Sequence, residues 1–289
     1  MIRSKGDKTF QIVLNIFMMI ITVCMILPFV LLLMSSLTDE NMLLAYGYSF
    51  FPKKFSLESY QYIFQNGSTI FKAYGITIFV TIVGTAISVM MTCMLAYGLS
   101  LKKLPGRTFF NFYVFFTMLF NGGLVPTYLM YTHLFHIKDT LFAQIIPSLL
   151  LNAVNVLLVR SYFSNNIPEA LFEAAEIDGA SQFTIFGKVV LPLGKPIIVT
   201  IGLFACLGYW NDWLNGLYYL NNEGLYNIQN FLNRMMSDAE FLSTHSFTSS
   251  AGAAMQVPTV SVRMAIAFVA MLPILVVFPF LQKYFVNGI

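Results

Sequence analysis

Residues 168–196 read PEALFEAAEIDGASQFTIFGKVVLPLGKP, a polar segment between two strongly apolar blocks of the chain. Four of its first eleven residues are acidic: Glu169, Glu173, Glu176 and Asp178. An acidic residue at the centre of a bilayer costs about 3 kcal/mol on the insertion scale, so four would cost on the order of 10 kcal/mol. The segment is therefore predicted to lie outside the hydrocarbon layer.

The beginning of this segment has the features of a short helix. Pro168 suits the first helical position, where its missing N–H removes no hydrogen bond. Glu169 follows in the first turn, where a negative charge is favourable to the helix dipole, and Gly179 is suited to end the helix. Three small or apolar residues share one face and would let another backbone approach closely: Leu171, Ala174 and Ala175.

The composition of the whole chain is that of a polytopic membrane protein. Of its 289 residues, 57% are apolar and only 10% are charged, and the mean hydropathy is +0.73. Soluble domains contain about 25% charged residues. The net charge of +3 is too small to indicate a nucleic-acid partner. All three cysteines lie in apolar stretches, which argues against a disulfide framework.

Six stretches are apolar enough to cross a bilayer, which takes about 20 residues. They cover approximately residues 12–36, 71–99, 109–132, 140–160, 196–220 and 262–282. The predicted fold is therefore an all-α membrane protein, with one transmembrane domain over residues 1–289. Two polar stretches, 38–70 and 221–261, are predicted to be external loops, the first with a short helix near 57–64.

The distribution of lysine and arginine indicates the orientation of these spans. If the N-terminus lies inside, ten basic residues fall on the inner side: Arg3, Lys5, Lys8, Lys102, Lys103, Arg107, Arg160, Lys188, Lys195 and Lys283. Six fall on the outer side or its edge: Lys53, Lys54, Lys72, Lys138, Arg234 and Arg263. Both termini and the segment 168–192 are therefore predicted to be cytoplasmic.

The spacing of residues within 173–192 resembles the EAA loop of permease subunits of binding-protein-dependent ABC importers. Three residues separate Glu173-Ala174-Ala175 from Gly179, and nine residues separate Gly179 from Val189-Val190-Leu191-Pro192. The form Ile177-Asp178-Gly179-Ala180 is typical of the carbohydrate branch. The stretches 120–128, 209–213 and 279–286 also look like the second permease of complex-sugar importers.

This resemblance implies the type I ABC importer permease fold in a bacterial cell membrane, with a coupling helix that contacts a separate ATPase. The residues that would carry this contact are Glu173, Ala174, Ala175, Asp178, Gly179, Ala180, Leu191 and Pro192. Phe183 and Phe186 would tie the following helix to the membrane bundle, unless both are ordinary core residues. Leu193-Gly194-Lys195, bracketed by Pro192 and Pro196, would place a break between this segment and the fifth span.

The resemblance also implies a set of partners. These are a second permease, a dimeric ATP-binding cassette ATPase that uses ATP and Mg²⁺, and an extracytoplasmic solute-binding protein. This chain would bind no cofactor itself, and it contains no G-x-x-x-x-G-K-[ST] phosphate loop. The substrate would be a carbohydrate that crosses by alternating access.

Two further groups of residues are candidates for the substrate pathway. Trp210-Asn211-Asp212-Trp213 lies within the fifth predicted span, and Asp212 is the only acidic residue inside an apolar span. Such residues usually face a bundle interior or a water-filled cavity, although an interfacial aromatic belt would also account for the tryptophans. Asn121, followed by a glycine pair, lies in the middle of the third span, where the glycines would allow either a bend or close helix packing.

Other classes of protein fit the sequence less well. An ion-coupled secondary transporter would show inverted repeats and several midplane charges, and a permease for a non-sugar solute remains an alternative. An intramembrane enzyme would need clustered His, Asp or Glu residues, so no catalytic residues are predicted. His133, His136 and Asp139 lie close together in sequence but do not form a convincing ligand set, and no metal site is predicted.

Overall fold

The computed structural model describes residues 5–65, 67–245 and 260–286, and the side chains of residues 8–65, 67–237 and 260–276. Within these ranges the regular structure is helical, apart from one isolated β-bridge between Thr38 and Phe55. The prediction of an all-α protein is confirmed. The chain divides into two compact units, Met1–Ser68 with Leu232–Pro273 and Thr69–Phe231 with Ile274–Ile289.

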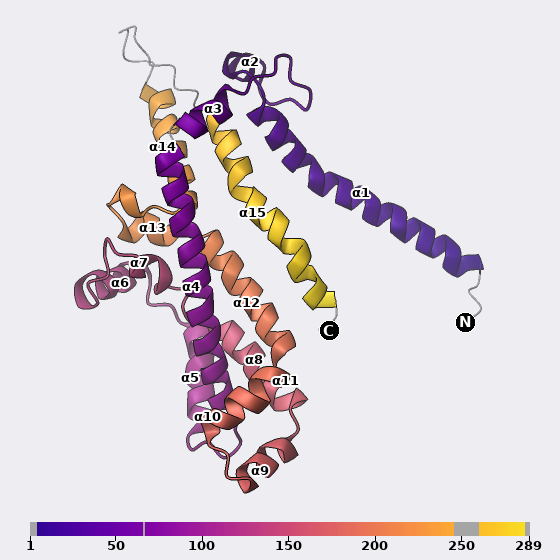
Figure 1. Cartoon of the computed structure of the whole chain (residues 1–289), viewed down its shortest axis with the longest axis vertical. Helices are drawn as coiled ribbons and strands as arrows, with labels where there is room; N and C mark the ends of the chain where they lie inside the picture. Colours follow the sequence, from indigo (N-terminus) through magenta and orange to yellow (C-terminus); the bar gives the residue numbers. More distant parts are fainter. Residues whose placement is uncertain (1–4, 66, 246–259, 287–289) are drawn as a thin grey trace. The chain divides into compact units, whose positions relative to one another are not determined.

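The first unit holds the N-terminal helices and most of two late helices (Figure 1). Its elements are α1 Lys5–Ser36, α2 Glu40–Tyr46, α3 Glu58–Gln65, α14 Ile228–His245 and α15 Val260–Val286. Lys8–Ser36 is long and apolar enough to cross a membrane, as predicted for the first span. Glu40 accepts hydrogen bonds from the backbone N–H groups of Val260 and Ser261, so its carboxylate caps the start of α15.

The second unit holds the remaining elements. They are α4 Gly67–Ser100, α5 Arg107–Leu119, α6 Leu124–Leu129, the π-helix η1 Met130–Leu134, α7 Phe142–Ile145, α8 Ala153–Asn166, α9 Glu169–Ile177, α10 Gln182–Ile185, the π-helix η2 Phe186–Val190, α11 Leu191–Leu193, α12 Lys195–Trp210, α13 Leu214–Tyr219 and the 3₁₀ helix η3 Glu223–Leu225. A continuous apolar cluster joins α4, α8, η2 and α12. Its buried members are Cys93, Ala96, Tyr97, Leu99, Val156, Val159, Phe163, Ile167, Ile185, Phe186, Val190 and Ile201.

The third predicted span, 109–132, is not a single helix. The chain leaves the helix at Phe120 and resumes it at Leu124, and the helical segments on either side make an angle of 113°. Gly123 adopts φ +90°, a conformation that only glycine adopts without strain, so this break follows directly from the glycine pair.

The predicted fourth and fifth spans are also interrupted. Between α7 and α8, the chain turns at Pro147 and at Ser148, which has φ +62°. The helix of the fifth span ends at Trp210 and α13 begins four residues later. Within the described residues, two helices are long and apolar enough to cross a membrane alone, or four if each bent pair forms one span. The count of six spans remains a prediction.

Candidate functional site

The helix α9 has well-defined ends. Pro168 has extended backbone angles and lies just before the helix, and Gly179 adopts φ +74° just after it. The N–H of Ala180 donates to the carbonyl of Ala175 at 2.9 Å, and the N–H of Gly179 donates to that of Glu176 at 3.0 Å. These two bonds form a Schellman motif, which requires a residue with positive φ at the position of Gly179. The predicted helix and its glycine stop are therefore confirmed.

The two faces of α9 differ from the expected arrangement. Ala175 and Ala180 are partly buried and pack against the core of the protein itself, together with Phe172. Ala174 is exposed, and Ile177 is 85% exposed at the end of the helix. The open apolar surface is therefore centred on Ile177, which the predicted set of contact residues does not include.

The segment after α9 adds a second exposed apolar side chain. Phe186 is buried and stacks near Tyr97, with ring centroids 5.4 Å apart, as expected of a residue that ties this segment to the bundle. Phe183 is 77% exposed, so the same expectation is wrong for this residue. Because α10 and η2 form one continuous helical stretch, Phe186 turns inward and Phe183 remains on the outer side.

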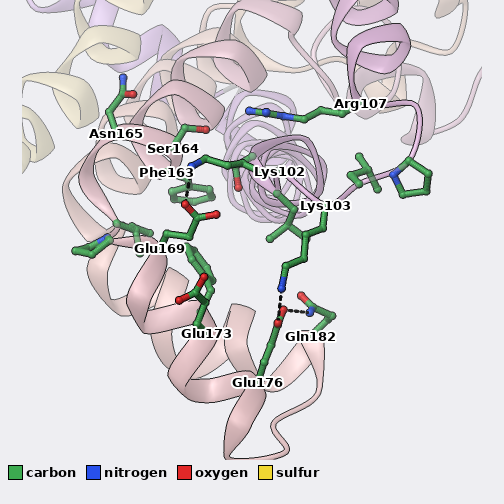
Figure 2. Close-up of a pocket in the computed structure, with 17 residues that line it drawn as sticks. Lys102, Lys103, Arg107, Phe163, Ser164, Asn165, Glu169, Glu173, Glu176 and Gln182 are labelled. Carbon is green, nitrogen blue, oxygen red and sulfur yellow. Dashed lines mark hydrogen bonds and ion pairs between the residues drawn. The ribbon is translucent and has the colours of Figure 1, made fainter.

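Two ion pairs fasten α9 to the short loop between α4 and α5 (Figure 2). Lys102 Nζ lies 2.5 Å from a carboxylate oxygen of Glu169, and Lys103 Nζ lies 2.9 Å from one of Glu176. The hydrogen bond from Lys103 and its charge lower the pKa of Glu176, and the same contact raises the pKa of Lys103. Both pairs are solvent-exposed, so they orient α9 more than they stabilise the fold.

A chain of hydrogen bonds continues from this clamp to the core. Gln182 Nε2 donates to Glu176 at 3.3 Å, and the Tyr97 hydroxyl donates to Gln182 Oε1 at 2.6 Å. Tyr97 lies in α4 and is 7% exposed. The exposed ion pair is thereby connected to a buried residue of a long helix.

A cavity of about 550 Å³ lies between the α4–α5 loop and α9. Its charged lining residues are Lys102, Lys103, Arg107, Glu169, Glu173 and Glu176. Glu173 points its carboxylate along this cavity (Figure 2) and has no ion-pair partner among the described residues, in contrast to the two glutamates that flank it. Glu173 is therefore the carboxylate of α9 that is available to a partner.

The predicted break before α12 is present. The helical stretch that ends at Leu193 and the helix that begins at Lys195 make an angle of 84°. Gly194 at this corner is buried, and a Cβ atom there would lie 2.7 Å from the Phe163 ring and 2.9 Å from the carbonyl oxygen of Val190. Leu191 packs against the core, whereas Pro192 is exposed. The corner therefore depends on the absence of a side chain at residue 194.

The candidate pathway residues are only partly brought together. Trp210 is 7% exposed, and its Nε1 has no hydrogen-bond partner among the described residues. Asp212 Oδ1 accepts from the N–H of Asn215 at 3.3 Å, while its buried Oδ2 has no partner within the described part of the chain. Asn211 and Trp213 are exposed in the turn between α12 and α13. Asn121 lies in the α5–α6 break, where its Oδ1 accepts from the N–H of Gly123.

Three buried asparagines hold the Asp212 turn, and the sequence did not single them out. Asn227 Nδ2 donates to the carbonyl of Asp212 at 2.8 Å, and Asn230 Nδ2 donates to that of Trp213 at 2.6 Å. Asn215 Nδ2 donates to the carbonyl of Pro147 at 3.0 Å. Two of these asparagines follow residue 221, in a stretch predicted to be a solvated loop. Polarity alone therefore could not reveal that they are buried.

The helical breaks and the clamped acidic helix belong to a helical chain with segments long and apolar enough to cross a membrane, and its sequence contains no phosphate loop. The chain belongs to the family of binding-protein-dependent transport system inner membrane components, whose model matches residues 5–289. It is thus a non-catalytic membrane permease of a bacterial ABC import system. The family supports this interpretation and not that of an ion-coupled transporter.

Individual relatives agree with this assignment. The chain is 35% identical over 282 residues to the polygalacturonan/rhamnogalacturonan transport system permease protein YtcP of Bacillus subtilis, covering 98% of this chain and 96% of the relative. It is 26% identical to the arabinooligosaccharides transport system permease protein AraQ of the same organism, covering 99% and 96%. Among solved structures, it resembles a chain of a bacterial ABC transporter involved in the import of the acidic polysaccharide alginate, with a TM-score of 0.82, 29% identity and 99% coverage of both chains.

Proposed function

We propose that this permease imports a carbohydrate and that α9 is the element through which a separate ATPase drives it. The observation that carries the proposal is the combination of an exposed apolar tip at Ile177 with an unpaired carboxylate at Glu173, on a helix clamped to α4. An apolar tip beside a charge is suited to a protein groove. Since the chain has no phosphate loop, the work must come from another subunit.

The proposed assembly follows from the family. It contains this chain, a second permease, an ATPase dimer that binds ATP and Mg²⁺, and an extracytoplasmic solute-binding protein. Both termini and α9 lie in the cytoplasm in this proposal, because ten of sixteen basic residues then fall on the inner side. Closure of the ATPase dimer would move α9 and open the membrane pathway toward the loaded binding protein.

The carbohydrate class is supported by the relatives, whose names specify polygalacturonan or rhamnogalacturonan, arabinooligosaccharides and alginate. Aromatic rings stack on the apolar faces of sugars, and carboxylate or amide groups bind hydroxyls. Trp210, Asp212 and Trp213 offer both kinds of group, and Asn211 and Asn121 add amides. The unpaired buried Oδ2 of Asp212 is the acceptor that a sugar hydroxyl could satisfy.

Coupling can be tested on the assembled complex. Glu173→Lys is expected to leave membrane insertion intact and to separate ATP hydrolysis from uptake, because the side chain lies outside the ion pairs that hold α9. Gly179→Asp is expected to act in the same direction by disturbing the positive-φ stop. A matched control is Glu58→Lys, which reverses an exposed carboxylate on α3, in a stretch predicted to be external. Normal uptake and normal ATPase association in the Glu173 and Gly179 variants would contradict the proposal.

A further inference from the structure

A second cavity of about 410 Å³ is an apolar groove formed by α4, α5 and the start of α8. Its lining residues are Leu95, Leu99, Phe109, Phe110, Tyr113, Val114, Thr117, Leu151, Ala153 and Val156. The aromatic side chains of α5 along this groove are largely exposed. The groove belongs to helices of the second unit and is separate from the coupling and pathway residues described above.

Two arginines lie near residues that line this groove, and one of them, Arg107, also lines the cavity beside α9. The Nε–H of Arg107 donates to the carbonyl oxygen of Leu99 at 3.1 Å, and the Leu99 side chain lines the groove. Arg160 follows Val156, another lining residue, by one turn of α8. Both arginines are therefore next to lining residues of the same groove.

Neither arginine has an acidic partner among the described residues. The neighbouring Lys102 and Lys103, by contrast, are paired with glutamates. The Nε of Arg160 is buried and has no hydrogen-bond partner within the described chain. A buried donor without an acceptor, beside a second positive charge, is unfavourable unless an anion completes it.

We propose that the groove is a binding site for an anionic phospholipid of the inner leaflet. Its phosphodiester would accept hydrogen bonds from Arg107 and Arg160, and one acyl chain would lie along the apolar groove between α4, α5 and α8. Guanidinium groups suit this role because they bind phosphate through paired N–H groups. Basic pockets between membrane helices on the cytoplasmic side are known to suit such headgroups.

This proposal rests on the inward orientation proposed above, but not on the coupling role of α9. The two can therefore fail separately. Variants at Glu173 leave the groove unchanged, and variants at Arg160 leave the exposed tip at Ile177 unchanged. A Glu173 variant that keeps coupling shows that the coupling role of α9 is wrong, whereas an Arg160 variant that keeps its affinity for anionic lipid shows that the lipid site is wrong.

Lipid binding can be measured on the intact importer complex in mild detergent. Phosphatidylglycerol and phosphatidylcholine are titrated separately, and bound lipid is counted by native mass spectrometry. Each guanidinium near a membrane surface contributes about a fivefold increase in affinity for anionic lipid. Arg160→Gln is therefore expected to weaken phosphatidylglycerol binding about fivefold, and Arg107→Gln with Arg160→Gln about 25-fold. Lys195→Gln is the matched control, since it removes one charge from an exposed position outside the groove.

A second variant tests the groove without changing any charge. Ala153→Leu adds a side chain to the lining and is expected to reduce lipid retention while both arginines remain. The proposal is overturned if phosphatidylcholine binds as tightly as phosphatidylglycerol, or if the Lys195 control loses as much lipid as the Arg160 variant. It is also overturned if a photo-crosslinker at Tyr113 labels the sister permease in lipid-saturated complexes, because another protein then occupies the groove.

Discussion

The exposed tip of α9 leads to a quantitative prediction for Ile177→Ala. This change removes three carbon atoms from a side chain that is 85% exposed, so almost all of its surface is available to a partner. At about 0.8 kcal/mol per buried carbon, full burial of these atoms in an ATPase groove corresponds to about 2 kcal/mol. We expect the affinity between the permease and its ATPase to fall about thirtyfold.

The assay is the affinity of the purified ATPase for the permease complex, measured together with substrate-stimulated ATP hydrolysis. The melting temperature of the permease should remain close to wild type, because Ile177 contributes little to the core. Leu44→Ala is the control, since Leu44 is 65% exposed on α2 and belongs to a stretch predicted to be external. If the affinity of the Ile177→Ala variant stays within about twofold of wild type, instead of falling about thirtyfold, the assignment of this tip as the docking surface is refuted.

Three further predictions concern the clamp, the corner and the pathway. Lys103→Glu should reduce coupled ATP hydrolysis a few-fold, as expected for an exposed ion pair, and Lys103→Glu combined with Glu176→Lys should restore it. Because the pKa of Glu176 is lowered, this pair is present above the ordinary carboxyl pKa of 4.5 and is lost only as the pH falls through the lowered value. Unchanged hydrolysis in the Lys103→Glu single variant at neutral pH would therefore exclude the clamp. Gly194→Ala should destabilise the permease by about 1–3 kcal/mol through overpacking, seen as a lower melting temperature, while Gly187→Ala, where a Cβ meets nothing within 4 Å, should not. Asp212→Asn should reduce uptake without loss of complex assembly, and unchanged uptake would favour the interfacial interpretation.

The parts of the fold that could be predicted from sequence are those set by local steric demands. Gly179, Gly194 and the pair at 122–123 each mark a stop or a bend, because the backbone there requires a positive φ or leaves no room for a side chain. Hydropathy located six apolar stretches, of which those at α1 and α4 are single helices long enough to cross a membrane. It could not show that several of them are broken, because an average over about 20 residues does not register a four-residue interruption.

The parts that could not be predicted depend on contacts between distant segments. Lys102 and Glu169 are 67 residues apart in the chain, and Lys103 and Glu176 are 73 apart. The composition of the α4–α5 loop indicated only which side of the membrane it occupies. Likewise, the sequence did not show that Ala175, which is small enough for a partner to approach, also packs partly against the core.

The geometry favours transmission of movement by α9 as a rigid element rather than through a flexible hinge. Phe172 and Ala175 pack against the core, and the corner at Gly194 leaves no room for a Cβ atom beside the Phe163 ring. Packed corners of this kind resist small deformations, because interiors are close-packed and any shift must displace several side chains at once. The exposed ion pairs set the orientation of α9, but they are too weak to resist its displacement. A push on Ile177 would therefore reach α4 through Gln182 and Tyr97 and reach α12 through the glycine corner, so both helices would move with the docking helix.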